Sequence, residues 1–259
     1  MTKRLLGFLL LCACATAQAR DPEKGKKILE QAVQALGGQA YLSVRDTRAQ
    51  GKAFVFSRYE ELEGMAPIVN YDRWPDKYRQ EQGKHHDVTF VLNGEKAWEA
   101  TFRGVREYPA QELEAIRMRR FLSLDYILRF RLGKEAGLEV AAMGSDLVDG
   151  RQVDIVEIND AENRTVTLAI DRHTHLPLRR EWVIPNAKFQ TRDEYVETLG
   201  KYAPAKGAHG VMVPLYVRRE TNGRKIFEAF FDEVQANARL SDSLFERPPG
   251  KDLPDPRRK

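Results

Sequence analysis

The sequence predicts an α+β protein dominated by one antiparallel β-sheet. From about Thr47 onward, apolar and polar residues alternate with a period of two, which is the pattern of strands with two different faces. Tight-turn dipeptides separate successive runs, and the connections are too short for the helical crossovers that parallel strands need. Two segments with a helical period of apolar residues supply the α component.

Asn-Gly and Asp-Gly pairs mark the hairpins most clearly. These residues tolerate the positive φ values of type I′ turns, whose twist matches that of antiparallel strands. The pairs are Asn93-Gly94, Asp149-Gly150 and Asn222-Gly223. Two further alternating runs, 165–170 and 178–184, lie between Asp149-Gly150 and Asn222-Gly223.

Helical periodicity occurs near the N-terminus and in the middle of the chain. Asp21 and Pro22 suit an N-cap and the first helical position, and Gly37-Gly38 ends the apolar pattern that follows. A second helical segment runs from Pro109 to about Leu132, with glutamates near its start and arginines further on, as the helix dipole favours.

The end of the chain predicts a capped helical turn followed by a tail. Residues 240–248 place Leu244 and Phe245 where they can insert into the body. Residues 249–259 are rich in proline and charge, and we expect them to be a disordered tail. Between residues 20 and 248, the length and the apolar content suit a single domain with its own core.

The first nineteen residues have the pattern of a secretory signal peptide. Lys3 and Arg4 precede a short apolar run, and Ala17-Gln18-Ala19 offers small residues for cleavage before Arg20. This predicts export to a bacterial periplasm. Leu11-Cys12-Ala13-Cys14 also resembles a lipobox, so the alternative is an outer-membrane lipoprotein that is lipidated at Cys14 and is membrane-associated for that reason.

Charge and cysteine content exclude two classes of chemistry. Removal of the signal peptide takes away both cysteines, which leaves no disulfide and no thiol nucleophile. The formal net charge of +4 comes from the two ends of the chain, because residues 20–256 are close to neutral. Without a clustered basic face, nucleic-acid binding has no electrostatic driving force.

The sequence gives no linear signature of an enzyme. It contains no Gly-x-Ser-x-Gly elbow, His-Glu-x-x-His helix, Gly-x-Gly-x-x-Gly loop or phosphate loop. His85 and His86 are adjacent, so in a strand they point to opposite faces, while His173 and His175 lie in a predicted turn. Because a metal site needs three or four convergent ligands, we expect no metal, no cofactor and no catalysis.

Two phrases of the chain carry a family resemblance. Residues 170–178 read Ile-Asp-Arg-His-Thr-His-Leu-Pro-Leu, and residues 242–246 read Asp-Ser-Leu-Phe-Glu. Together with the leading helix and a meander interrupted by helix, they resemble the superfamily of periplasmic lipoprotein-sorting carriers, LolA and LolB. The resemblance implies a half-open barrel, a strongly curved antiparallel sheet whose concave face is covered by helices around an apolar cavity for acyl chains. This chain is longer than a standard carrier, which leaves the cargo open.

Aromatic residues are the candidates to line such a cavity. Strands with apolar residues on both faces suit a sheet placed between a cavity and other structure, although the same residues also build ordinary cores. Arg179-Arg180 and Arg218-Arg219 are interpreted first as outward strand positions, and alternatively as a lipid-headgroup site or an anchor for a helical lid. The cavity candidates are Phe54, Phe56, Trp98, Phe102, Phe121, Trp182 and Phe230.

Three functions remain, in decreasing order of preference. The first is a non-enzymatic envelope carrier or receptor that binds lipid or lipoprotein acyl chains, with a helical lid that opens and closes. The second is a structural or protein-interaction module that contacts an envelope protein partner. The third is a hydrolase whose site leaves no linear motif, since a fold does not fix a function.

Overall fold

A computed structural model describes residues 20–186 and 190–253, so the predicted signal peptide and Cys14 lie outside the described residues. Thirteen strands form one sheet in which every neighbouring pair is antiparallel. The strands are β1 Asp46–Phe56, β2 Leu62–Arg73, β3 Lys77–Gln82, β4 Val88–Asn93, β5 Lys96–Thr101, β6 Gly104–Glu107, β7 Glu139–Val148, β8 Arg151–Asn159, β9 Thr165–Asp171, β10 Pro177–Asn186, β11 Thr191–Pro204, β12 Met212–Thr221 and β13 Arg224–Ala236.

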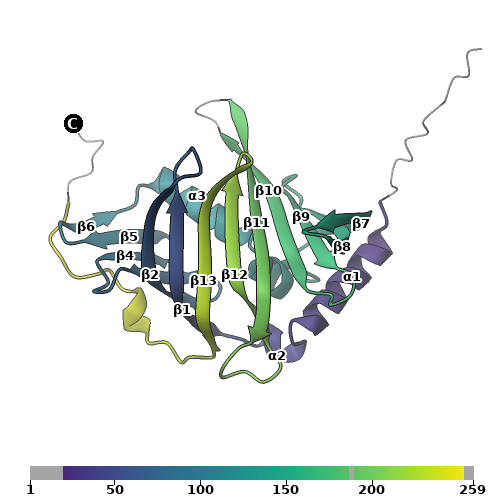
Figure 1. Cartoon of the computed structure of the whole chain (residues 1–259), viewed down its shortest axis with the longest axis horizontal. Helices are drawn as coiled ribbons and strands as arrows, with labels where there is room; N and C mark the ends of the chain where they lie inside the picture. The colour runs from purple at the N-terminus through teal and green to yellow at the C-terminus, as the bar shows by residue number, and fades with distance from the viewer. Residues whose placement is uncertain (1–19, 187–189, 254–259) are drawn as a thin grey trace, which may run out of the picture.

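The sheet is two meanders joined at the middle. Its spatial order runs from β6 through β1 to β13 and on to β7, so the first and last strands of the chain pair with each other (Figure 1). Strands β6 and β7 are the two edges, and the sheet stays open between them. The predicted α+β class with a curved antiparallel sheet is confirmed.

Helices occupy the N-terminus, the connection between the two meanders and a short segment after β13. They are α1 Pro22–Ala35, α2 Gln39–Leu42, α3 Ala110–Phe121, α4 Leu124–Tyr126, the π-helix η1 Ile127–Arg131 and the 3-10 helix η2 Asp242–Phe245. Both predicted helical segments are therefore confirmed. Asp21 caps α1 by accepting a hydrogen bond from the Lys24 amide, which satisfies one of the free donors of the first turn.

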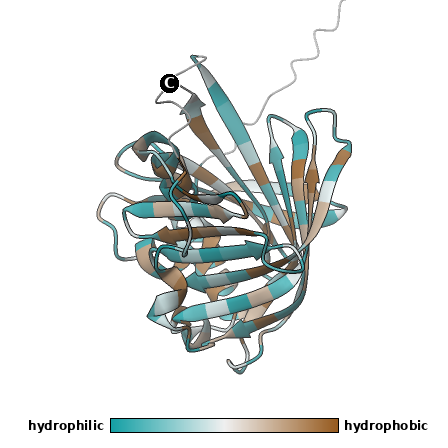
Figure 2. Ribbon diagram, turned by 90° about the vertical axis from the view of Figure 1, so that its left-hand side faces the viewer, coloured by the Kyte–Doolittle hydropathy of each residue, from teal (hydrophilic) through white to brown (hydrophobic). Residues whose placement is uncertain are grey.

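The helices α3, α4 and η1 cover the concave face of the sheet, whereas α1 packs beside β7 and β8 (Figure 1). Leu113 and Ile116 of α3 pack against Leu92 and Ala97 of the first meander. The largest core cluster joins α1, α4 and η1 to β7–β11. Apolar and polar residues alternate along many of the strands, which gives these strands one apolar and one polar face (Figure 2).

The three predicted hairpin turns are present and divide into two kinds. Asp149-Gly150 and Asn222-Gly223 occupy the two central positions, with φ values of 47° and 75° and of 52° and 72°, as type I′ requires. The turn at Asn93-Gly94 differs. Asn93 is the last residue of β4 and pairs with Lys96, so Gly94 alone has a positive φ, of 58°.

A β-bulge in β13 shifts by one residue which positions of that strand face the cavity: Phe227 and Phe231 line it before the bulge, and Val234 and Ala236 after it. Gln50 pairs with Glu233 and Gly51 with Phe231, which leaves Asp232 as the extra residue. A Cβ atom at Gly51 would lie 2.0 Å from the carbonyl oxygen of Phe230, so only glycine permits this approach of the two backbones.

Replacing Gly51 by alanine is expected to lower the free energy of unfolding by about 1–3 kcal/mol or more, because the backbone of β13 must move. Urea unfolding followed by circular dichroism measures the change. Gly64→Ala in β2 is the matched control, since nothing lies within 4 Å of its added Cβ. Equal stability of the two variants would contradict the assigned role of Gly51.

The C-terminal segment packs along the outer part of the first meander. Phe245 of η2 is completely buried, as expected, and Arg79 donates a hydrogen bond to the Leu244 carbonyl. Further on, the amides of Val105 and Leu253 bond across to the carbonyls of Lys251 and Val105, at 2.8 Å each. Residues 251–253 thus lie alongside edge strand β6 in a parallel bridge, whereas the sequence predicts a disordered tail from residue 249 onward; residues 254–259 of that tail lie outside the described residues.

Candidate functional site

A cavity of about 510 Å³ lies between the concave face of the sheet and the helices that cover it. Its floor is formed by β1–β4 and β10–β13, and its cover by α2, α3, α4 and η1. The volume is within the range of about 300–1,000 Å³ that is usual for small-molecule sites. Apolar lining residues include Leu36, Val44, Leu199, Val213, Val217 and Phe231.

The seven aromatics proposed from the sequence lie outside this cavity lining. Trp98 packs with Val91 in a separate small cluster, and Trp182 stacks on Tyr195 within the main core, with ring centroids 5.3 Å apart. Phe102 is 90% exposed at the turn between β5 and β6. Phe121 lies under the Arg131 guanidinium and beside a second pocket of about 480 Å³.

Strand alternation explains why Phe54, Phe56 and Phe230 do not face the cavity. Phe227 and Phe231 line it, so their neighbour Phe230 points to the opposite face, where its ring contacts Phe54 at a centroid distance of 5.9 Å. Phe56 follows Phe54 at a spacing of two and stacks against Lys225. For these three residues, the strands chosen from the sequence do border the cavity, but the side chains lie on the opposite face of the sheet.

The paired arginines divide between the two faces of the sheet. Arg180 and Arg219 line the cavity, while Arg179 and Arg218 point outward and pair with glutamates of their own strands. The outward interpretation therefore holds for one member of each pair.

Glu197 of β11 lies between the two inward arginines. It is directly opposite Arg180 on β10 and Arg219 on β12, and each guanidinium donates to one of its carboxylate oxygens at 2.9 Å. Burial alone would raise the pKa of Glu197, but the two guanidiniums lower the pKa to about 2. The carboxylate is therefore ionised and shared between two cations.

Two arginines fasten the C-terminal end of α3 to the sheet. Arg180 donates a second hydrogen bond to the carbonyl of Leu122, the C-cap residue of α3, where a cation also suits the helix dipole. Arg120 on α3 itself donates to Asp72 of β2 at 2.7 Å and to the Pro75 carbonyl at 2.7 Å. The helical cover is thus held from both meanders.

The part of the cavity lining that comes from α2, α4, η1 and the turn after β2 is aromatic and polar. Tyr41 of α2 donates a hydrogen bond from its hydroxyl to Asp125 at 3.0 Å, and burial raises the pKa of both groups. The central carbon of the Arg120 guanidinium lies 4.1 Å from the ring centroid of Trp74, which belongs to the turn after β2. Beside them lies Arg129 of η1, which is buried.

Within the described residues, no group of three or more histidine, cysteine, aspartate or glutamate side chains is placed to hold a metal ion. His173 and His175 lie in the turn after β9, where Asp171 accepts hydrogen bonds from the amides of His173 and Thr174. No helix in residues 20–186 and 190–253 is long and apolar enough to cross a membrane.

Solved structures with a similar fold include three bacterial proteins. A DUF1329 family protein from Desulfovibrio piger matches with a TM-score of 0.57 and 15% identity over 87% of this chain and 98% of its own. A putative outer membrane lipoprotein-sorting protein domain from Vibrio parahaemolyticus matches with 0.53 and 11% over 87% and 97%. A LolA superfamily protein from Nitrosomonas europaea matches with 0.50 and 9% over 86% and 97%.

The chain has the LolA-like fold. Neither a protein-family model nor a curated protein matches the sequence. At these identities the likeness concerns the fold alone, and the function has to be argued from the cavity.

In this LolA-like chain, sequence reasoning missed the polar part of the cavity. Trp74 lies in the turn after β2, and Tyr41, Asp125 and Arg129 belong to helices of three to five residues, which are too short for periodicity to show which side is buried. The one available signal was the density of arginine in a helical segment that is otherwise apolar, where Arg129 and Arg131 follow Ile127 and Leu128.

Proposed function

We propose that this protein is a non-enzymatic binding protein or carrier of the bacterial envelope that holds an acyl chain in the cavity between the sheet and its helical cover. The observation that carries the proposal is the cavity itself. It is lined largely by apolar side chains on the concave face, and its described lining residues include no histidine and no cysteine.

Export supports the same function. We propose that residues 1–19 direct secretion and are removed before Arg20. Lipidation at Cys14 would instead tether the protein to the outer membrane as an acceptor. The mass of the mature N-terminus distinguishes a soluble carrier from a tethered one.

Filling the cavity is expected to abolish retention of an acyl chain. Ala49 of β1 lines the cavity and is half-buried, so Ala49→Phe places a ring in the space without displacing a packed core residue. We expect native mass spectrometry to detect co-purified lipid on protein purified from membranes. In the Ala49→Phe variant we expect the amount of co-purified lipid to be at least 10-fold lower.

Lys52→Phe is the matched control for this variant. Lys52 is exposed on the same strand, and its neighbours Gly51 and Ala53 are buried against the concave side, so the new ring points away from the cavity. Lipid in the control and none in Ala49→Phe supports the proposal. Equal lipid in both variants, or none in the unaltered protein, contradicts it.

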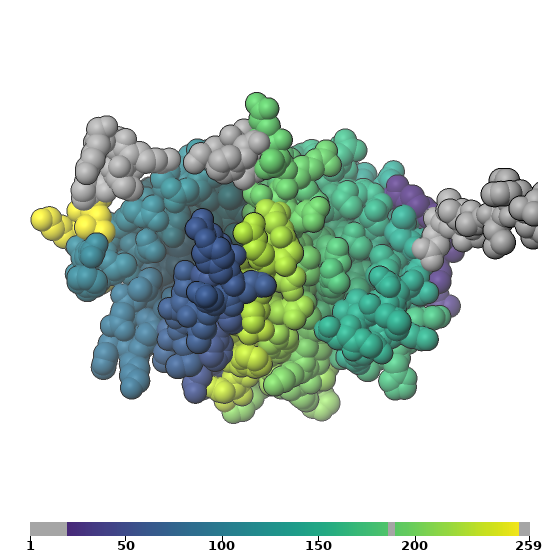
Figure 3. Space-filling view, turned by 45° about the horizontal axis from the view of Figure 1, so that its top comes forward, coloured from purple at the N-terminus to yellow at the C-terminus, as the bar shows by residue number. Residues whose placement is uncertain are grey.

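A protein-interaction module is the second candidate, and the tips of two hairpins favour it. Val55, Tyr59, Leu62 and Met65 of the β1–β2 hairpin are large apolar residues that are 46–68% exposed. This tip lies beside the tip of β12–β13, where the Lys225 amide donates to Glu60 at 2.8 Å (Figure 3). An exposed apolar rim of this kind is typical of contact surfaces.

A further inference from the structure

Arg129 is a charged side chain that is almost completely buried at the cavity. Its exposed fraction is 4%, and it belongs to η1, the π-helical turn that closes the cover. The side chain lines the cavity, with its Nε atom fully enclosed and without a hydrogen-bond partner.

No ion pair or side-chain hydrogen bond joins Arg129 to another part of the described chain. Its nearest acidic neighbour in sequence, Asp125, accepts from the Tyr41 hydroxyl instead. The backbone carbonyl of Arg129 accepts from Lys134, but this contact leaves the guanidinium unused.

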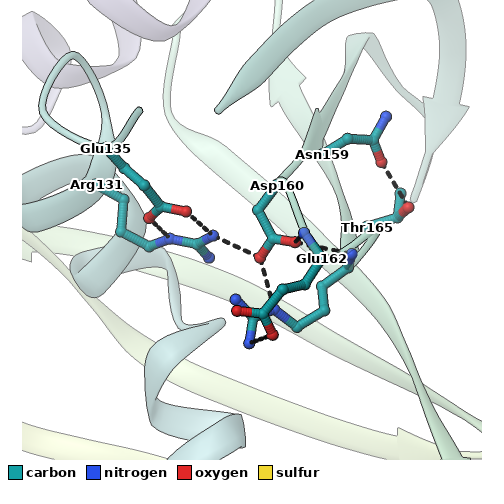
Figure 4. Close-up of polar contacts among 7 residues, drawn as sticks. Arg131, Glu135, Asn159, Asp160, Glu162 and Thr165 are labelled. Atoms are coloured by element: carbon teal, nitrogen blue, oxygen red, sulfur yellow. Dashed lines mark hydrogen bonds and ion pairs between the residues drawn. The ribbon is translucent and has the colours of Figure 1, made fainter. Parts of the chain in front are cut away.

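Arg131, two residues further on, shows what a satisfied buried arginine in this helix looks like. It is 3% exposed, and its guanidinium donates to both oxygens of Glu135 and, at 2.8 Å, to Asp160, which also binds Arg164 (Figure 4). The same π-helical turn thus contains one arginine with a full set of carboxylate acceptors and one with none.

Aromatic rings surround the guanidinium of Arg129, and the nearby Asp125 carboxyl interacts with its charge without accepting a hydrogen bond from it. Its central carbon lies 5.9 Å from the ring centroid of Tyr41, 5.4 Å from that of Trp74 and 5.3 Å from that of Phe130. Such contacts orient a cation and offset part of its desolvation, but they supply no hydrogen-bond acceptor. An anion that enters the cavity would supply both the charge and the acceptors.

The charged residues of the cavity lining also favour an anionic ligand. Five arginines line it against three acids, Asp72, Asp125 and Glu197. Arg120 pairs with Asp72, and Arg180 and Arg219 share Glu197. Arg119 of α3 also lines the cavity and has no ion pair within the part of the chain that the structure describes, but it is exposed to solvent, so the buried positive charge without an ion pair is that of Arg129.

We infer that the cavity binds an anionic amphiphile, with a carboxylate or phosphate monoester group on the guanidinium of Arg129 and an alkyl chain along the apolar lining. This inference rests on the proposed function and adds the charge of the ligand to it. Bidentate geometry makes arginine well suited to planar carboxylate and to phosphate oxygens.

Titration of delipidated full-length mature protein with three classes of probe tests the inference. Dodecanoate and dodecyl phosphate carry chain and charge, dodecanol carries the chain alone, and acetate and inorganic phosphate carry the charge alone. We expect at least one charged amphiphile to bind 10-fold or more tightly than dodecanol, and acetate and phosphate to bind more weakly than either, because a charge-assisted hydrogen bond in a dry site contributes about that factor.

Arg129→Met should reduce the affinity for the charged amphiphile at least 10-fold and leave dodecanol binding unchanged. Removal of an unpaired buried charge should also leave the unfolding temperature of the ligand-free variant no lower than that of the unaltered protein. Arg218→Met removes a cation on the opposite face of the sheet and should change neither quantity. If Arg129→Met fails to fold, Arg129→Gln takes its place.

The outcomes separate this inference from the proposed function. Equal affinity for charged and neutral chains, or a preference that survives loss of Arg129, overturns the anion site and leaves the carrier function standing. Tight binding of acetate or inorganic phosphate alone overturns the amphiphile in favour of a small free anion. Failure of every chain-bearing probe to bind overturns both proposals.

Discussion

Replacing Glu197 by glutamine is expected to lower the free energy of unfolding by about 3–5 kcal/mol, because it leaves two buried guanidiniums without their counter-charge. Arg180 and Arg219 flank this residue on adjacent strands, so the variant places two like charges beside a neutral amide. Removing one partner of a buried ion pair lowers the free energy of unfolding by more than the intact pair adds to it, since the remaining charges stay desolvated.

Guanidinium chloride unfolding measures this loss, and Glu181→Gln is its matched control. Glu181 lies on β10 and pairs with Arg179 at 2.8 Å, but both side chains are more than one-third exposed, so this pair contributes no more than about 1 kcal/mol. A similar small effect for both variants would show that the cluster around Glu197 is screened by water and carries little stability.

The same cluster predicts the acid stability of the protein. The pKa of Glu197 is about 2 in the folded chain and 4.5 in its usual state, so the folded form holds its proton less tightly than the unfolded form. Its contribution to stability is therefore complete above pH 4.5 and is lost as the pH falls from about 4.5 toward about 2. In the glutamine variant this part of the pH dependence should be absent.

Sequence patterns predicted the strands of this protein better than they predicted its cavity. Asp149-Gly150 and Asn222-Gly223 determine local turn geometry, and local geometry is what dipeptides encode. Which face of a strand turns inward depends on register, and a shift of one residue exchanges the two faces. Phe230 and Phe231 differ by one position, and only Phe231 lines the cavity.

Register also explains why the buried cluster was not foreseen. Arg180, Glu197 and Arg219 are distant in sequence and meet because β10, β11 and β12 align them side by side. The alternative interpretation of these arginines, as an anchor for a helical lid, matches the bond from Arg180 to the Leu122 carbonyl. Arg129 lies within the predicted helical segment that ends near Leu132, where a helical pattern gives no reason to expect a buried arginine, so its burial follows from how η1 packs on α2 and the turn at Trp74.

Arg120→Ala is expected to release the helical cover while leaving the sheet folded. Arg120 joins α3 to the turn between β2 and β3 through bonds to Asp72 and to the carbonyls of Pro75 and Lys77, and it stacks on Trp74. Because each charge-assisted bond contributes about 1–3 kcal/mol and the contacts form one unit, we expect a loss of about 3 kcal/mol that is concentrated in α3.

Hydrogen exchange localises this effect, which a global unfolding curve cannot do. Amides of α3 should lose about 100-fold of their protection in Arg120→Ala, while those of β8–β11 keep theirs, because local opening no longer breaks the contacts to Asp72 and Pro75. Arg117→Ala is the control, since Arg117 is exposed on the same helix and makes no hydrogen bond or ion pair within the described chain. A uniform loss of protection in all elements would mean that α3 opens only together with the sheet, and the cover could then not act as a lid over the cavity.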